Sequence, residues 1–130
     1  MNKSAQETLV SAWIAAGNTE IGSDIFRQNL WALEELDDLV EQSAARALEV
    51  ILAILATAPS SGINDVKAKL AAGPMENLLS RHGAEIIESV EKEASANPQF
   101  RLLLGGVWRS DMPEEIWLRI RAIADSTGWD

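Results

Sequence analysis

The stretch Leu70-Ala-Ala-Gly-Pro-Met-Glu-Asn-Leu-Leu-Ser-Arg-His-Gly83 indicates the fold class of this 130-residue chain. Proline is accepted at the first position of a helix and disfavoured inside one, so Gly73-Pro74 is expected to end one helix and begin the next. The apolar residues between Pro74 and Gly83 have helical spacing. Similar punctuation follows at Asn97-Pro98, Gly105-Gly106 and Met112-Pro113. The pattern predicts short helices joined by tight turns.

Working outward from this stretch, apolar residues recur at helical spacing through the rest of the chain. The core face expected for the helix over Asp24 to Val40 is Phe26, Leu30, Leu33, Leu36 and Val40. The expected helices are one that Ser4 begins and Gly17 ends, then Asp24 to Val40, Ser43 to Ala56, Asn64 to Ala71, Pro74 to Gly83, one from Ala84, one from Asn97-Pro98, and one that Pro113 opens and Gly128 ends. A loop is expected at Pro59 to Gly62.

No segment combines alternating β-branched or aromatic residues with hairpin turn chemistry, so we expect no strand. The predicted class is all-α: a compact array of about seven short antiparallel helices. Two arrangements fit this pattern, an α-α superhelix of the HEAT type and an orthogonal bundle. The length is that of one domain, which we place over residues 1–130.

The net charge of −9 is concentrated in the first half of the chain. Residues 1–66 hold ten acidic against three basic side chains, a net charge of −7, whereas residues 67–130 hold ten against eight, a net charge of −2. Binding to a phosphate backbone needs clustered Lys and Arg, so direct nucleic-acid binding is not expected. A basic protein partner fits the charge better.

The first residues lack the apolar run of a signal peptide, and the most apolar stretch, residues 47–58, is shorter than the ~20 residues that cross a bilayer. There is no cysteine, which excludes disulfides and thiolate metal sites. We therefore expect a cytoplasmic protein that does not cross a membrane and holds neither a metal ion nor a cofactor.

The motif of residues 70–83, together with Asn97-Pro-Gln-Phe-Arg101 and Leu104-Gly-Gly-Val-Trp108, resembles the bacterial family of uncharacterised DUF6869-type domains. The segments around Trp13, Trp31-Ala-Leu-Glu-Glu-Leu36 and Arg46-Ala-Leu-Glu-Val-Ile-Leu52 are similar too, so the resemblance covers nearly the whole chain. Met75 stands where related sequences often have Leu, which conserves volume. The resemblance implies a compact helical domain without an established activity, and it transfers no catalytic residue.

The first candidate site is an acidic face along the helix expected over about residues 24–40 and at its C-terminal end. Its carboxylates are Glu34, Glu35, Asp37, Asp38 and Glu41. Like charges four residues apart, as in Glu34 and Asp38, destabilise a helix by a few tenths of a kcal/mol. A solvated helix face explains this run, and so does a docking surface for a basic protein. The same oxygens suit calcium or magnesium, but no loop has the ligand spacing of such a site.

The second candidate is a polar site that groups Arg81, His82 and Glu85 with Arg101 and Arg109, which lie near other turns. His82 is the single histidine, so no catalytic triad can be identified. Gly83 is expected to break the helix between His82 and Glu85, which favours a structural role for the histidine over metal binding.

A third group, Trp108, Arg109, Asp111 and Met112, has residue types common at binding hot spots, although Trp108 lies on an apolar stripe and is expected in the core. Close helix packing or a helix end is expected to explain Gly105 and Gly106.

The sequence thus favours a non-enzymatic, acidic protein-interaction domain, of the kind that serves as an inhibitor or immunity protein against a basic partner. Charge and size support that analogy, and no motif does. One alternative is an enzyme or small-ligand binder with a polar pocket near Arg81 and His82. Another is a structural domain that forms a homodimer or other homo-oligomer.

Overall fold

Helices dominate the computed structural model, which describes residues 2–58 and 64–129, and none of these residues forms a strand. The elements are α1 (Lys3–Gly17), α2 (Asp24–Gln42), α3 (Ala44–Thr57), α4 (Asp65–Leu70), the π-helical turn η1 (Ala71–Met75), α5 (Glu76–Ala96), α6 (Pro98–Gly105) and α7 (Glu114–Ile123). The all-α prediction is confirmed. The loop predicted at Pro59 to Gly62 lies outside the described residues.

Polar side chains cap several of these helices. Asn2, rather than Ser4, begins α1, since its Oδ1 accepts a hydrogen bond from the Ala5 N–H at 2.8 Å. Ser43 lies between two helices: its N–H donates to the Leu39 carbonyl that ends α2, and its Oγ accepts from Arg46 N–H to begin α3. A single residue therefore reverses the chain between α2 and α3.

The expectation that Gly73-Pro74 separates two helices is wrong. The chain stays helical from Asp65 through η1 into α5, with Pro74 inside the π-helical turn. A π turn adds one residue to the hydrogen-bond ladder, so it can accommodate a proline that has no N–H to donate and would clash inside a regular helix.

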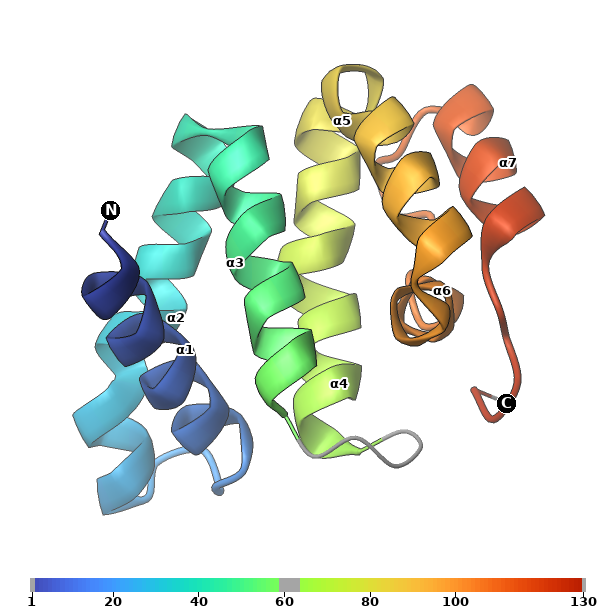
Figure 1. Ribbon diagram of the computed structural model, residues 1–130. Helices are drawn as coiled ribbons and strands as arrows, with labels where there is room; N and C mark the ends of the chain where they lie inside the picture. The colour runs from blue at the N-terminus through green and yellow to red at the C-terminus, as the bar shows by residue number, and fades with distance from the viewer. Residues whose placement is uncertain (1, 59–63, 130) are drawn as a thin grey trace.

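The break expected at Gly83 is present one residue earlier, at His82, whose φ of −130° and ψ of 23° are not helical. Figure 1 shows the chain turning at this kink, so that the second half of α5 runs back beside the first. Gly83 fits against α7 there, because a Cβ atom on it would lie 3.0 Å from Cγ2 of Ile116.

The helices lie side by side in an array (Figure 1). Helices α1 and α2 lie at one end, and α6 and α7 lie at the other. The centre holds α3 and the continuous helical segment formed by α4, η1 and the first half of α5. One buried cluster draws residues from α1 through α7. Helix α3 is central: Ala47, Ile51 and Ile54 have no exposed surface. No helix of the described residues has both the length and the apolar composition needed to cross a membrane.

The buried side of α2 agrees only in part with the predicted one, of which Leu36 and Val40 are buried. Ala32, Leu36, Leu39 and Val40 are buried, whereas Leu30 is 36% exposed and Phe26 and Leu33 are only partly covered. Three of these four buried residues, Leu36, Leu39 and Val40, lie in the C-terminal half of α2, so the cover that the other helices give is more complete there. Helical spacing alone could not show how far along α2 this cover extends.

The chain beyond α7 is not helical, so the prediction that Gly128 ends the last helix is also wrong: α7 ends at Ile123. The following segment, residues 124–129, returns to α6, where the Asp125 N–H donates to the Arg101 carbonyl at 2.9 Å. We call it the C-terminal segment. On the other side, α7 is tied to α5 by the ion pair of Arg119 with Glu91.

Candidate functional site

The acidic face of α2 is solvent-exposed. Its carboxylates all lie in the C-terminal half of the helix and all are exposed: Glu34, Glu35, Asp37, Asp38 and Glu41. The buried residues of the same half, Leu36, Leu39 and Val40, turn toward the core and hold this face outward. The residues that pack α2 into the fold therefore also fix the direction in which its negative charge points.

One residue of the predicted polar site joins this face. Arg81 Nη1 lies 3.0 Å from Glu41 Oε1, and both side chains are more than half exposed. An ion pair this exposed adds at most about 1 kcal/mol to stability. Its consequence is mainly local, because it neutralises one end of the acidic face and leaves the carboxylates nearer the middle of α2 uncompensated.

The pKa of Asp37 is raised above its ordinary value, first by partial burial and then by the charges of Asp38 and Glu41. Glu34 adds a smaller effect in the same direction, and Arg81 opposes it. The folded state therefore binds the Asp37 proton more tightly than the unfolded chain does. The stabilisation this gives is fully present below the unfolded pKa and is lost as the pH rises through the raised folded pKa.

We expect Asp37→Asn to raise the free energy of unfolding at pH 7 by about 0.5 kcal/mol, since it removes like-charge repulsion along the helix. The gain over the wild type should shrink as the pH falls through the raised pKa of Asp37, because Asp37 then becomes protonated in the wild type as well. Urea denaturation at several pH values measures this difference. Glu35→Gln is the control, since Glu35 is not among the charges that shift the pKa of Asp37; an equal gain from Glu35→Gln would contradict the explanation.

An apolar groove of about 290 Å³ lies beside the acidic face. Its apolar wall includes Trp13, Phe26 and Leu33, and its polar edge is formed by Asp37 and Lys69. The Lys69 ammonium donates to the Gly17 carbonyl at 3.0 Å, which holds it at the rim near the end of α1. Asp37 therefore belongs both to the acidic face and to the groove. We call the acidic face and this groove together the α2 surface.

More apolar side chains are exposed just before α2 and along its first half. They are Ile21 (81% exposed), Ile25 (52%), Leu30 (36%) and Trp31 (45%). Of these four, Ile21 lines the apolar groove, whereas Trp31 lines a separate hollow against α1. Single exposed apolar residues are ordinary, so Ile21 is the one that adds apolar surface to the groove.

The match to a known family covers this surface. The model of a family of unknown function, DUF6869, matches residues 19–128. The chain belongs to this family. The matched range includes the acidic face and most of the groove, together with all elements from α2 to α7. A search of curated proteins and a search of solved structures each found no match to the DUF6869 chain.

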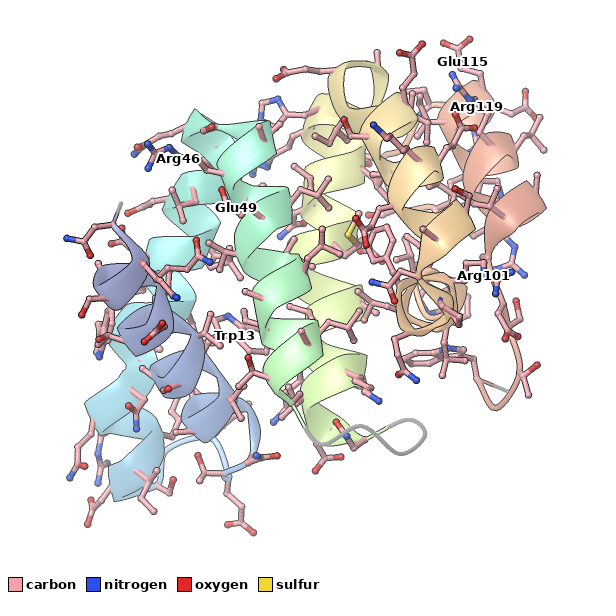
Figure 2. The ribbon with its side chains drawn as sticks, in the orientation of Figure 1. Trp13, Arg46, Glu49, Arg101, Glu115 and Arg119 are labelled. Atoms are coloured by element: carbon pink, nitrogen blue, oxygen red, sulfur yellow. The ribbon has the colours of Figure 1, made fainter. Side chains whose placement is uncertain are left out.

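The other predicted polar residues have separate contacts in this DUF6869 domain. His82 Nδ1 lies 3.7 Å from Glu85 Oε1, while its Nε2 is buried and has no hydrogen-bond partner among the described residues. Arg109 Nε donates to the Met112 carbonyl at 3.3 Å. Arg101 belongs to α6, and Figure 2 shows it at the end of the array opposite to Trp13 of α1. The contacts thus join His82 to Glu85 but connect neither to Arg101 or Arg109.

Among the described residues, no three His, Cys, Asp or Glu side chains are grouped so that they could hold a metal ion.

The structure also shows a groove that the sequence did not indicate. It lies between the end of α6, α7 and the C-terminal segment, and has a volume of about 510 Å³. Three tryptophans line it: Trp108, Trp117 and Trp129. Trp108 was expected in the core but is 75% exposed. A sequence signal was present, since three of the five tryptophans lie in the last 23 residues, but their meeting depends on the fold of the C-terminal segment.

Proposed function

We propose that this DUF6869 domain is a non-enzymatic, cytoplasmic protein-interaction domain that binds a basic segment of a protein partner through the α2 surface. The observation that carries the proposal is the placement of an apolar groove directly against an exposed run of carboxylates, with Asp37 shared by both. A helix face that is merely solvated would account for the exposed carboxylates but not for an apolar groove beside them. The groove adds a place where an apolar side chain can be buried.

The chemistry of the α2 surface defines the partner. The negative charge of residues 1–66 attracts basic proteins and speeds their encounter, while the groove gives contacts that slow dissociation. The fitting segment is amphipathic, with one apolar side chain for the groove and Lys or Arg residues facing the acidic face. A small acidic domain of this kind would block or scaffold its partner, as an inhibitor or immunity protein does.

The test uses a synthetic amphipathic helix of Leu and Lys, labelled for fluorescence anisotropy, as a stand-in for the basic segment. We expect saturable binding at low salt, weakened about tenfold when Glu34, Asp37, Asp38 and Glu41 are all changed to amides. The loss should be smaller at 0.5 M salt, where the Debye length has fallen to a few Å and charges no longer contribute much.

A matched control removes the same number of charges elsewhere, by changing the exposed Glu88, Asp111, Glu114 and Glu115 to amides. This variant has the same net charge as the first, so it should bind the peptide nearly as well as the wild type if position matters. Equal weakening by both variants would show that peptide binding depends only on the net charge of the domain. Unchanged binding by the α2 variant would show that the acidic face is not the docking surface.

A further inference from the structure

We propose that the groove lined by Trp108, Trp117 and Trp129 binds a small planar organic acid, with an aromatic ring on the indoles and a carboxylate on Arg121. We call it the tryptophan groove. It is formed by α6, α7 and the C-terminal segment, at the end of the array opposite to the α2 surface (Figure 1). The proposal therefore goes beyond the protein-interaction function and can fail independently of it.

The tryptophan groove has a fixed floor and an open rim. Trp129 is anchored, because its Nε1 donates to the Leu102 carbonyl at 2.7 Å and its ring lies against Gly105 and Gly106. Trp117 is partly buried against the core, and Trp108 is 75% exposed at the groove. The tryptophan groove thus offers a ligand two indoles that are packed in place, those of Trp117 and Trp129, and the exposed indole of Trp108. Indole faces favour stacking on other planar rings.

Arg121 is held in place for an anion. Its guanidinium carbon lies 5.3 Å from the ring centre of Trp117, and its Nη2 donates to Ser126 Oγ at 2.9 Å. A guanidinium carries five N–H donors, so most of the fork remains available after the bond to Ser126. None of the ion pairs among the described residues includes Arg121, whereas Arg119 of the same helix pairs with Glu91. An arginine fork binds a carboxylate with two parallel hydrogen bonds.

Charge and shape select the ligand class. Arg121 is the single charged side chain among the described residues that line the tryptophan groove, so a cation is disfavoured and an anion favoured. Small-molecule sites commonly have volumes of ~300–1,000 Å³, apolar and aromatic walls and a few fixed polar groups. The tryptophan groove has these features, with about 510 Å³, three indoles, Arg121 and Ser126.

The experiment titrates the full chain with three probes of similar size: phenylacetate, cyclohexylacetate and benzylamine. Binding is followed by the NMR signals of the tryptophan indole N–H groups, each assigned with a Trp→Phe variant. For phenylacetate we expect a Kd of about 1 mM, the range typical of a ligand of this size. Cyclohexylacetate lacks the planar ring and should bind at least fivefold more weakly, and benzylamine should not saturate.

Two variants test the assigned roles. Arg121→Gln should weaken phenylacetate binding at least fivefold, whereas Arg46→Gln, which removes the same charge from α3, should leave it unchanged (Figure 2). Trp108→Ala should weaken phenylacetate more than cyclohexylacetate, since it removes a stacking face and little else. Both side chains are exposed, so the variants are expected to fold.

Three results would overturn the proposal. The first is equal binding of all three probes, and the second is phenylacetate binding that Arg121→Gln leaves intact. The third is a blocked Phe-Asp dipeptide that binds more than tenfold more tightly than phenylacetate, because this would assign the tryptophan groove to a protein partner. None of these results would affect the peptide experiment on the α2 surface.

Discussion

Gly106→Ala is expected to lower the free energy of unfolding by about 2–3 kcal/mol, the cost typical of overpacking a filled site. A Cβ atom on Gly106 would lie 2.5–2.7 Å from three carbons of the Trp129 ring. The backbone is not the cause, because Gly106 has φ −91° and ψ 0°, which alanine adopts without strain. The cost comes from the indole, which must leave its place and give up the hydrogen bond to the Leu102 carbonyl.

Gly105→Ala should be at least as costly, since its Cβ would lie 2.0 Å from the Asp125 carbonyl oxygen. That oxygen belongs to the backbone of the C-terminal segment, which is held to α6 by the bond from Asp125 N–H to Arg101. The simplest relief is release of the whole segment. Both glycine variants should therefore increase the solvent exposure of Trp129, measured as a red shift of tryptophan emission alongside urea denaturation.

Gly73→Ala is the control for these two glycines, since no atom lies within 4 Å of the Cβ it would gain. In a helical position this change should be neutral or add up to about 1 kcal/mol. The double variant Gly106→Ala/Trp129→Ala should be no less stable than Trp129→Ala, because the clash has lost its partner. A full additional loss in the double variant would show that the glycine is needed for some other reason.

The sequence predicted close helix packing or a helix end for Gly105 and Gly106, and α6 does end at Gly105, with Gly106 as its cap. The sequence did not identify the side chain that packs there. Trp129 lies more than twenty positions away, and the expected helix end at Gly128 would have carried it along α7 instead of back to α6. Two adjacent glycines in the sequence indicate a special position, but only the path of the C-terminal segment shows that Trp129 packs against them.

Gly73-Pro74 illustrates the opposite case, in which a strong local rule was overridden. Proline disfavours a regular helix by about 3 kcal/mol, yet Pro74 lies within a continuous helical segment. The π-helical turn removes part of that cost, and the full burial of Leu70, Ala71 and Met75 on either side of Gly73-Pro74 stabilises the segment as well. Tertiary burial of this kind has no signature in the spacing of the residues.

The acidic face could be located from sequence because it depends on neighbours within one helix. Five carboxylates among eight consecutive residues must share an exposed side of α2 wherever the helix packs. The apolar groove beside the acidic face could not be located from the sequence. Trp13 and Lys69 come from α1 and α4, and they reach Phe26 only because three helices pack together. The proposed α2 surface thus combines a local feature with one that only the fold creates.

Phe100→Ala and Trp108→Ala should have very different effects, although the sequence places both residues on one apolar stripe. Phe100 has no exposed surface, and truncating such a residue costs about 3–5 kcal/mol. Trp108 is 75% exposed, and its backbone N–H, which donates to Glu76 Oε1, is retained in alanine. Its truncation should cost no more than about 0.5 kcal/mol.

Urea denaturation followed by circular dichroism measures both variants without depending on tryptophan emission. A domain of ordinary stability has a free energy of unfolding of about 5–15 kcal/mol. Phe100→Ala removes a large share of that free energy and should lower the urea concentration at the midpoint of unfolding strongly. Phe100→Leu keeps most of the volume and serves if the alanine variant does not fold. A large loss in Trp108→Ala would mean that its indole packs on the domain in solution. The tryptophan groove would then lack the exposed ring that the proposed acid is expected to stack on.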